Sequence, residues 1–217
     1  NKMTETLSLR AKIEQSPMGA YQWMIVVMAA IMNLLDGFDV LALAFTATAI
    51  RGEFGLTGIE LGYLLSAGLF GMTAGSLFLA PLADKIGRRP LLLMAVSLSA
   101  IGMLGSAFIS QYQWLGFWRV ITGLGVGGIL VGTNVITSEY SSRKWRSFAI
   151  SVYAAGFGIG AVLGGMFAVM LQGEYGWRSV FLAGAILTGL LLVVLFIWLP
   201  ESIDFLTSKQ PKNAEVR

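Results

Sequence analysis

Six stretches of mostly apolar residues, each long enough to cross a lipid bilayer, dominate this sequence of 217 residues. A helix needs about 20 such residues to span the hydrocarbon core of a membrane. Only 12% of the residues are charged, whereas a soluble domain carries about 25%. We therefore predict an all-α membrane protein whose six helices span the bilayer at residues 21–46, 58–82, 90–110, 115–138, 146–171 and 177–199.

Basic residues are distributed unevenly between the two sides of the predicted bundle. Short polar turns separate the six spans, so neighbouring helices run antiparallel and both chain ends lie on one side. Basic loops stay in the cytoplasm, so residues 1–20 and 200–217 are predicted to be cytoplasmic, on either side of a membrane bundle at 21–199. The opposite side carries only Arg51 and Arg178. The basic residues on the predicted cytoplasmic side are Lys2, Arg10, Lys12, Lys85, Arg88, Arg89, Arg143, Lys144, Arg146, Lys209, Lys212 and Arg217.

Glycine residues mark one face of the second span and one face of the fifth. Small residues at this spacing let helix backbones approach closely, and tight packing is enough to explain most of them. These two spans occupy equivalent places if the chain consists of two three-helix units, which predicts a 3+3 inverted repeat. The glycines are Gly68, Gly71 and Gly75 in the second span and Gly156, Gly160 and Gly164 in the fifth.

Asp36 and Asp39 lie within the first predicted span. A charged carboxylate at the bilayer centre costs about 2.5–3.5 kcal/mol, and a spacing of three places both side chains on one helix face. They could serve as structural hydrogen-bond acceptors between helices, but Ser or Asn would do this at lower cost. Two carboxylates this close titrate as a unit, so we interpret them as a proton-coupling element.

From the rise per residue of a helix, Arg119 lies about 6–8 Å inside the outer end of the fourth span, and Asp39 lies about 10 Å below the outer end of the first span. If the first and fourth helices adjoin, these groups can pair, or change partners on protonation. The alternative is that Arg119 extends its guanidinium to the membrane interface.

The turn between the second and third spans, residues 82–90, reads LADKIGRRP. Gly87 permits a tight reversal, and Pro90 suits the first turn of the next helix. This turn resembles the signature loop of the major facilitator superfamily, Gly-x-x-x-Asp-Arg/Lys-x-Gly-Arg-Arg/Lys, with Ala80 in place of the first glycine. Residues 116–127 and the LPES sequence at 199–202 resemble further motifs of that superfamily.

The DGFD sequence at residues 36–39 resembles the aromatic acid:proton symporter family, and so do SAGLFGM at 66–72 and TSEY at 137–140. Members of the superfamily have twelve helices in two six-helix halves. The resemblance therefore implies that this chain is an amino-terminal half, whose tail at 208–217 begins the central cytoplasmic loop. The other half, or a second copy, would complete it.

The same resemblance implies a secondary active transporter of a bacterial inner membrane. It would take up an aromatic carboxylate such as benzoate or hydroxybenzoate, or a ring-cleavage product such as muconate, together with protons and by alternating access. Ala161 stands where proton antiporters of the superfamily tend to carry proline, which favours symport. The expected partners are a small organic anion, protons, the lipid bilayer and the second half, with no nucleic acid, metal or cofactor.

Three sets of residues are predicted to carry this function. Proton coupling and substrate binding fall to Asp36, Asp39 and Arg119. A cavity between the first, second, fourth and fifth helices is expected to be lined by Asn33, Phe38, Phe45, Asn134 and Tyr153. A cytoplasmic gate is expected at Asp84, Gly87, Arg88, Arg89, Glu139 and Arg146.

Other functions remain compatible with the sequence. The chain could transport another small organic anion or a sugar-like solute, or serve as a six-helix scaffold without transport. An intramembrane hydrolase is disfavoured, because such an enzyme needs its two aspartates on different helices.

Overall fold

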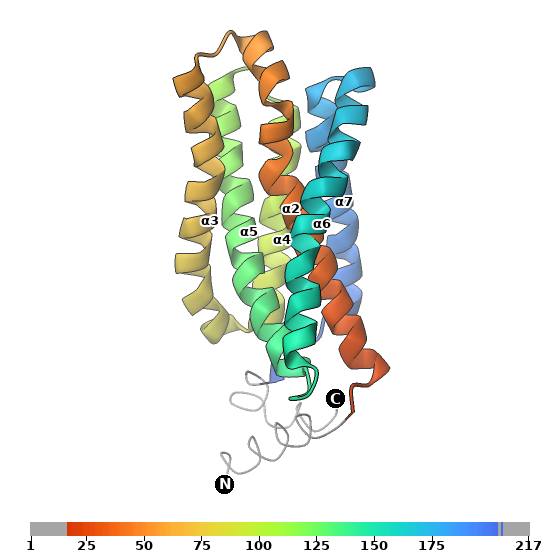
Figure 1. Ribbon diagram of the computed structural model, residues 1–217. Helices are drawn as coiled ribbons and strands as arrows, with labels where there is room; N and C mark the ends of the chain where they lie inside the picture. The colour runs from red at the N-terminus through yellow and green to blue at the C-terminus, as the bar shows by residue number, and fades with distance from the viewer. Residues whose placement is uncertain (1–16, 204, 206–217) are drawn as a thin grey trace.

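The computed structural model describes residues 17–203 and 205, and it folds them into six long helices that run side by side (Figure 1). All six are long and apolar enough to cross a membrane, so the predicted six-helix bundle is confirmed. Of the cytoplasmic segments predicted at 1–20 and 200–217, residues 1–16, 204 and 206–217 lie outside the described part of the chain. The helices are α2 (Ala20–Phe54), α3 (Gly58–Ile86), α4 (Arg88–Ala107), α5 (Tyr112–Tyr140), α6 (Arg146–Tyr175) and α7 (Trp177–Trp198).

Local sequence explains where the helices end. α2 runs beyond its apolar stretch to Gly55, whose φ of 63° lies in the left-handed region that glycine adopts without strain. α4 ends at Ala107, three residues before the predicted end of the third span at residue 110. α7 ends just before Leu199, which is extended at φ −71° and ψ 120°, because the residue preceding a proline is disfavoured in a helix.

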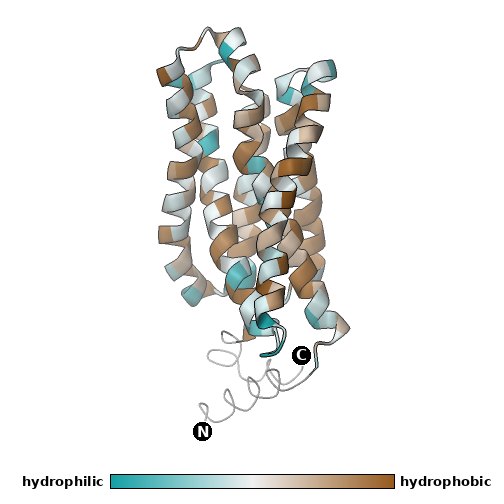
Figure 2. Ribbon diagram, in the orientation of Figure 1, coloured by the Kyte–Doolittle hydropathy of each residue, from teal (hydrophilic) through white to brown (hydrophobic). Residues whose placement is uncertain are grey.

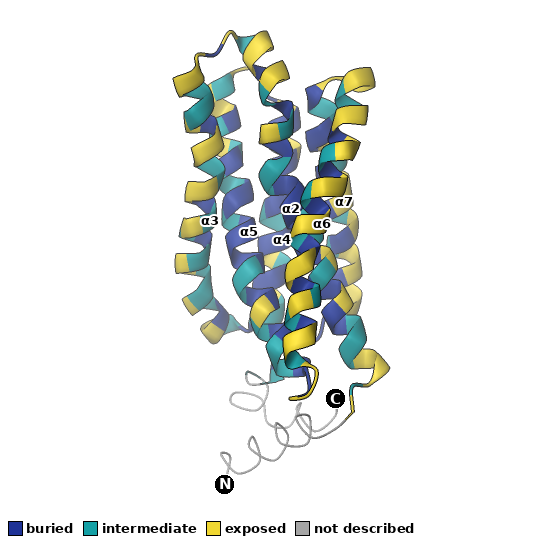
Figure 3. Cartoon of the chain, in the orientation of Figure 1, coloured by how far each residue is buried: buried dark blue, intermediate teal, exposed yellow. Residues whose placement is uncertain are grey.

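Two of the helices lie inside the bundle, and two expose most of their surface. Of an apolar 18-residue stretch in each helix, 56% is buried in α2 and 61% in α5, but only 17% in α3 and 22% in α6. Figure 3 shows this contrast, and Figure 2 shows that hydrophobic residues recur along the outer helices. α3 and α6 therefore present large apolar faces to lipid or to another protein surface. Exposed members include Leu69, Phe70, Leu77 and Phe78 of α3, and Val162, Leu163, Met166 and Met170 of α6.

Glycines join the helices along two seams, α3 against α5 and α2 against α6. A methyl group added at Gly71 of α3 would overlap the backbone of α5 at Val120. One added at Gly160 of α6 would overlap the backbone of α2 at Leu34. Exchanging the first three helices with the last three maps one seam onto the other, as expected for a 3+3 inverted repeat.

An ion pair joins the end of α2 to the start of α7. Arg178 binds both carboxylate oxygens of Glu53, at 2.7 and 2.9 Å, and its guanidinium lies 4.4 Å from the centre of the Trp177 ring. The indole nitrogen of Trp177 donates a further hydrogen bond to Glu53 at 2.6 Å. Arg178 also donates to the carbonyl of Ile109 in the α4–α5 turn, at 3.2 Å. This group, the Glu53 clasp (Glu53, Trp177 and Arg178), therefore ties three parts of the bundle together.

Candidate functional site

Asp39 lies at the junction of α2, α4 and α7, with 0% of its surface exposed. Its Oδ2 accepts a hydrogen bond from Ser99 of α4 at 2.8 Å and one from Thr188 of α7 at 3.5 Å. Its Oδ1 is buried and has no hydrogen-bond partner among the described residues. One oxygen of Asp39 thus links three helices, while the other is unsatisfied.

Asp36 lies one helical turn earlier on α2 and is also buried, at 2% exposed. Its Oδ2 has no hydrogen-bond partner within residues 17–203. A buried carboxylate without a partner is costly whenever it is charged. Structural hydrogen bonding between helices therefore accounts for part of Asp39 and leaves Asp36 unexplained.

Arg119 of α5 points into the bundle and is 3% exposed. Its Nη1 lies 3.6 Å from the sulfur of Met103, and its guanidinium carbon lies 5.4 Å from the centre of the Phe181 ring. An arginine that reaches for the membrane interface would leave its charged end exposed. The interior position of Arg119 does not fit that alternative.

The expected contact between Arg119 and an aspartate is absent from this structure. Within the described part of the chain, no hydrogen bond or ion pair joins Arg119 to Asp36 or to Asp39. Arg119 and Asp39 are neighbours of one residue, because the sulfur of Met103 contacts Arg119 and its methyl group lies, with Oδ1 of Asp39, beside Gly184. The site therefore holds a fixed positive charge and two acids without direct pairing.

A small cavity opens beside Arg119. Its volume is about 30 Å³, which is room for one or two water molecules. α2, α3 and α5 form its walls, and Arg119 and Thr122 are its polar members. The remaining lining is Val40, Leu43, Leu64, Leu65, Gly68, Leu69, Met72, Gly123 and Val126.

Two of the residues predicted to line a cavity come together. The side-chain nitrogen of Asn33 donates to the backbone carbonyl of Tyr153 at 2.8 Å, and both residues are buried. The Tyr153 hydroxyl lies 3.2 Å from the hydroxyl of Thr133. These contacts link α2, α6 and α5 inside the bundle, so here Asn33 and Tyr153 join helices.

The other three predicted lining residues lie apart from this pair. Phe38 is 3% exposed and packs where Gly164 of α6 and Gly184 of α7 leave room for its ring. Phe45 is half-buried and packs against Gly165. Asn134 is exposed on α5. The structure thus places Phe38 in the core between helices, and of these three residues only Asn134 on an open surface.

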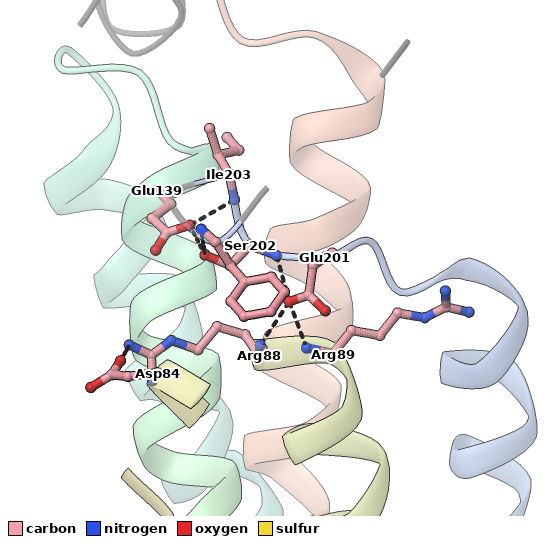
Figure 4. Close-up of polar contacts among 8 residues, drawn as sticks. Asp84, Arg88, Arg89, Glu139, Glu201, Ser202 and Ile203 are labelled. Carbon is pink, nitrogen blue, oxygen red and sulfur yellow. Dashed lines mark hydrogen bonds and ion pairs between the residues drawn. The ribbon is translucent and has the colours of Figure 1, made fainter. Parts of the chain in front are cut away.

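Four of the predicted gate residues lie together at the end of the bundle where α2 begins, near Glu201, which was not predicted (Figure 4). They are Asp84, Arg88, Arg89 and Glu139. Oε1 of Glu201 accepts hydrogen bonds from the backbone nitrogens of Arg88 at 2.7 Å and Arg89 at 3.0 Å. Gly87 has a φ of 103°, and a side chain there would collide with the Glu201 carboxylate. Glu201, three residues beyond the end of α7, thus caps the start of α4.

A second carboxylate holds the same segment against α5 (Figure 4). Oε2 of Glu139 accepts from the Ser202 hydroxyl at 2.7 Å and from the backbone nitrogen of Ile203 at 3.0 Å. The Tyr140 hydroxyl donates to the carbonyl of Glu201 at 2.6 Å. The chain after α7 is therefore fixed to both α4 and α5.

The side chains of Arg88 and Arg89 extend from this contact to further partners. Nη2 of Arg88 lies 2.6 Å from Oδ1 of Asp84, and Nη2 of Arg89 donates to the carbonyl of Phe196 at 2.7 Å. Arg146 begins α6. An ion pair thus links the start of α4 to the end of α3, and a hydrogen bond to a backbone carbonyl links it to the end of α7.

Sequence reasoning missed several functional candidates. Glu201 lies in the LPES motif, a signal that was noted without a role for its carboxylate. Ser99, Thr188 and Met103 are ordinary residues of apolar helices, and nothing in their local sequence distinguishes them.

Comparison with known proteins agrees with this architecture. Residues 29–215 match the Major Facilitator Superfamily. The chain is 34% identical over 217 residues to the 4-hydroxybenzoate transporter PcaK of Pseudomonas putida, covering 100% of this chain and 48% of that protein. It is 36% identical over 204 residues to the gallate transporter of the same organism, covering 94% and 45%. The chain thus spans about half the length of these relatives, which are named as transporters and not as enzymes.

Solved structures show the same fold. The xylose transporter XylE from E. coli, in a partially occluded inward-open conformation, matches with a TM-score of 0.81 and 21% identity, over 90% of this chain and 54% of that one. A bacterial homologue of the human lysosomal transporter Spinster matches with a TM-score of 0.76 and 20% identity, over 86% of this chain and 44% of that one. By its six-helix fold and by the match over residues 29–215, this chain belongs to the Major Facilitator Superfamily.

Proposed function

We propose that this chain is the amino-terminal half of a twelve-helix transporter that takes up an aromatic carboxylate together with protons. The relatives named for 4-hydroxybenzoate and gallate support this substrate class, as does the cis,cis-muconate transport protein of Acinetobacter baylyi, 29% identical over 189 residues. The DGFD sequence at residues 36–39 agrees with them. Benzoate, a hydroxybenzoate or a ring-cleavage product such as muconate is the expected solute.

The observation that carries the proposal is the buried arrangement of two acids and one arginine without direct pairing. Asp36 and Asp39 can take up or release a proton inside the bundle, because each has a buried oxygen that no residue in the described range satisfies. Arg119 keeps its positive charge at all physiological pH values. A substrate carboxylate brings the opposite charge, so its arrival changes the electrostatic balance around both acids.

Alternating access requires a second half and a gate. The apolar faces of α3 and α6 offer the surface on which a second six-helix unit would pack. At the predicted cytoplasmic end, the contacts among Glu201, Arg88 and Asp84 would form and break as the two halves rock against each other during the transport cycle. The functional gate would then comprise the predicted residues together with Glu201.

We further propose that the protein lies in a bacterial inner membrane with both chain ends in the cytoplasm. α2 begins and α7 ends at the same end of the bundle (Figure 1). The turns at that end carry Lys85, Arg88, Arg89, Arg143 and Lys144, which is the distribution found on cytoplasmic sides.

The test is uptake of radiolabelled 4-hydroxybenzoate by cells or vesicles that contain the complete protein, with and without a proton gradient. Accumulation that collapses with the gradient supports proton-coupled uptake. Competition by unlabelled benzoate and gallate, and not by xylose, supports the substrate class. A protein that moves neither aromatic acids nor sugars under any gradient would favour the scaffold alternative.

A further inference from the structure

Met103 of α4 contacts Arg119 and lies beside Asp39, and it is 0% exposed. Its sulfur is 3.6 Å from Nη1 of Arg119. Its terminal methyl group occupies the space left by the missing side chain of Gly184, where a Cβ atom would overlap it. The same Cβ would lie 3.2 Å from Oδ1 of Asp39. The methyl group of Met103 and the unsatisfied oxygen of Asp39 therefore border one small space.

The direct contacts of the Arg119 guanidinium are unusual for an arginine. Opposite charges attract strongly inside a protein, and an arginine side chain offers five N–H donors. Arg119 nevertheless contacts a thioether, which is a weak acceptor, and the face of the Phe181 ring. Asp36 is the further acid that α2 contributes to this interior. Met103 touches the guanidinium through its sulfur and, through its methyl group, borders the same small space as the free oxygen of Asp39.

We propose that Met103 is a positioning residue that prevents Arg119 and Asp39 from forming an ion pair, and so keeps the guanidinium available to the carboxylate of the substrate. This inference rests on the proposed function for its consequence in transport. A methionine suits the task, because its unbranched chain has three rotatable bonds and adapts to the space around it. When the methyl group withdraws, the acid and the arginine can meet.

The first test is the affinity of the purified complete protein for 4-hydroxybenzoate, measured by isothermal titration calorimetry. Met103→Ala removes the spacer, and if the new ion pair occupies Arg119 for nine-tenths of the time, the apparent affinity falls about tenfold. Met103→Leu keeps a side chain of similar volume and is expected to bind nearly as well as the unchanged protein. Met32→Ala is the matched control, since Met32 is equally buried, at 2% exposed, and packs in a separate cluster.

The second test needs no substrate. Thermal unfolding midpoints are measured for Asp39→Asn, Met103→Ala and the double variant. If truncation of Met103 lets the pair form, Asp39→Asn lowers the midpoint more in the Met103→Ala background than in the unchanged protein, so the two changes are not additive. The same cycle with Met32→Ala is expected to be additive. Should Met103→Ala fail to fold, Met103→Val, which leaves a smaller cavity, enters the same cycle.

The two tests separate this inference from the proposed function. An unchanged protein that binds no aromatic carboxylate would count against the proposed function, while the unfolding cycle would still decide on Met103. An additive cycle for Met103 and Asp39 would overturn the inference and leave Met103 as a packing residue. Equal losses of affinity in Met103→Ala and Met32→Ala would overturn it as well.

Discussion

The carboxylate of Glu201 lies over the first turn of α4, with its Oε1 2.7 Å from the backbone nitrogen of Arg88. The first N–H groups of a helix have no partner within the helix and bear a partial positive charge. A carboxylate at this point satisfies them and complements the charge. Since Glu201 follows α7, the contact joins the last helix of the bundle to its third.

Replacing Glu201 tests this contact. Glu201→Ala leaves the start of α4 uncapped and is expected to destabilise the protein by about 1 kcal/mol, as loss of a helix N-cap does. We expect a lower rate of uptake with unchanged substrate affinity, because the contact lies far from the buried acids. Glu201→Gln keeps an acceptor oxygen and should retain more activity. Spin-label distances across the two halves of the complete protein would show the changed populations, and a loss of affinity equal to the loss of rate would contradict a gating role.

The buried acids give a second prediction. Asp36→Asn and Asp39→Asn should each abolish accumulation driven by a proton gradient, because neither amide can carry a proton between the two sides. Asp36→Asn should also leave thermal stability unchanged or improved, since it replaces a buried group that lacks a hydrogen-bond partner among the described residues. Glu174→Gln, at an exposed acid of α6, is the matched control. Full accumulation in either aspartate variant would exclude that residue from proton coupling.

Arg119 gives a third prediction. Arg119→Ala is expected to cripple uptake of aromatic carboxylates, and Arg119→Lys to restore it only in part, because a guanidinium differs from an ammonium group in shape as well as in donors. Uptake kinetics of the complete protein measure both effects. Normal kinetics in Arg119→Ala would mean that the buried charge serves packing alone.

The Glu53 clasp gives a prediction about stability. Glu53→Gln weakens a bidentate pair and the hydrogen bond from Trp177, and both side chains of the pair are 40% exposed. At that exposure we expect a loss of about 0.5–1 kcal/mol, seen as a lower thermal unfolding midpoint. The difference between the variant and the unchanged protein should shrink in high salt. A difference that is independent of salt would point to the hydrogen bond from Trp177 as the main contribution.

The glycine seams give a fifth prediction, with its control on the same helix. Gly160→Ala forces a methyl group into the backbone of α2 at Leu34 and is expected to cost about 1–3 kcal/mol or more. Gly158→Ala adds the same group where no atom of another helix lies within 4 Å. It should be harmless, because alanine favours a helix over glycine. Similar unfolding midpoints for the two variants would contradict the close approach of α2 and α6.

The six helices could be predicted from the sequence, because the apolar length that determines a span is local in the chain. The depth of Asp39 was estimated as about 10 Å below the end of its helix, but α2 continues to Phe54, so Asp39 lies about 22 Å from that end and Arg119 about 10 Å from the start of α5. The partners of Asp39 could not be predicted in this way. Ser99 and Thr188 approach it from helices 60 and 149 residues away, and only the packing of α4 and α7 brings them together.

The same reason explains why the surroundings of the predicted cavity residues could not be read from the sequence. Phe38 was predicted to line a cavity, whereas in the structure its ring fills the space left by Gly164 and Gly184 on two other helices. Met103 gave no signal at all, since a methionine in an apolar helix is an ordinary observation. What these residues do depends on the side chains opposite them, which a single sequence does not reveal.

Backbone lying directly on backbone has a mechanical consequence. Side chains that interdigitate can yield by changing rotamers, but the contacts of Gly71 with Val120 and of Gly160 with Leu34 contain no rotatable bond that could absorb a displacement. We therefore expect α2 and α6 to move together, and likewise α3 and α5. A shift of α2 at Asp39 is then expected to displace α6 with it.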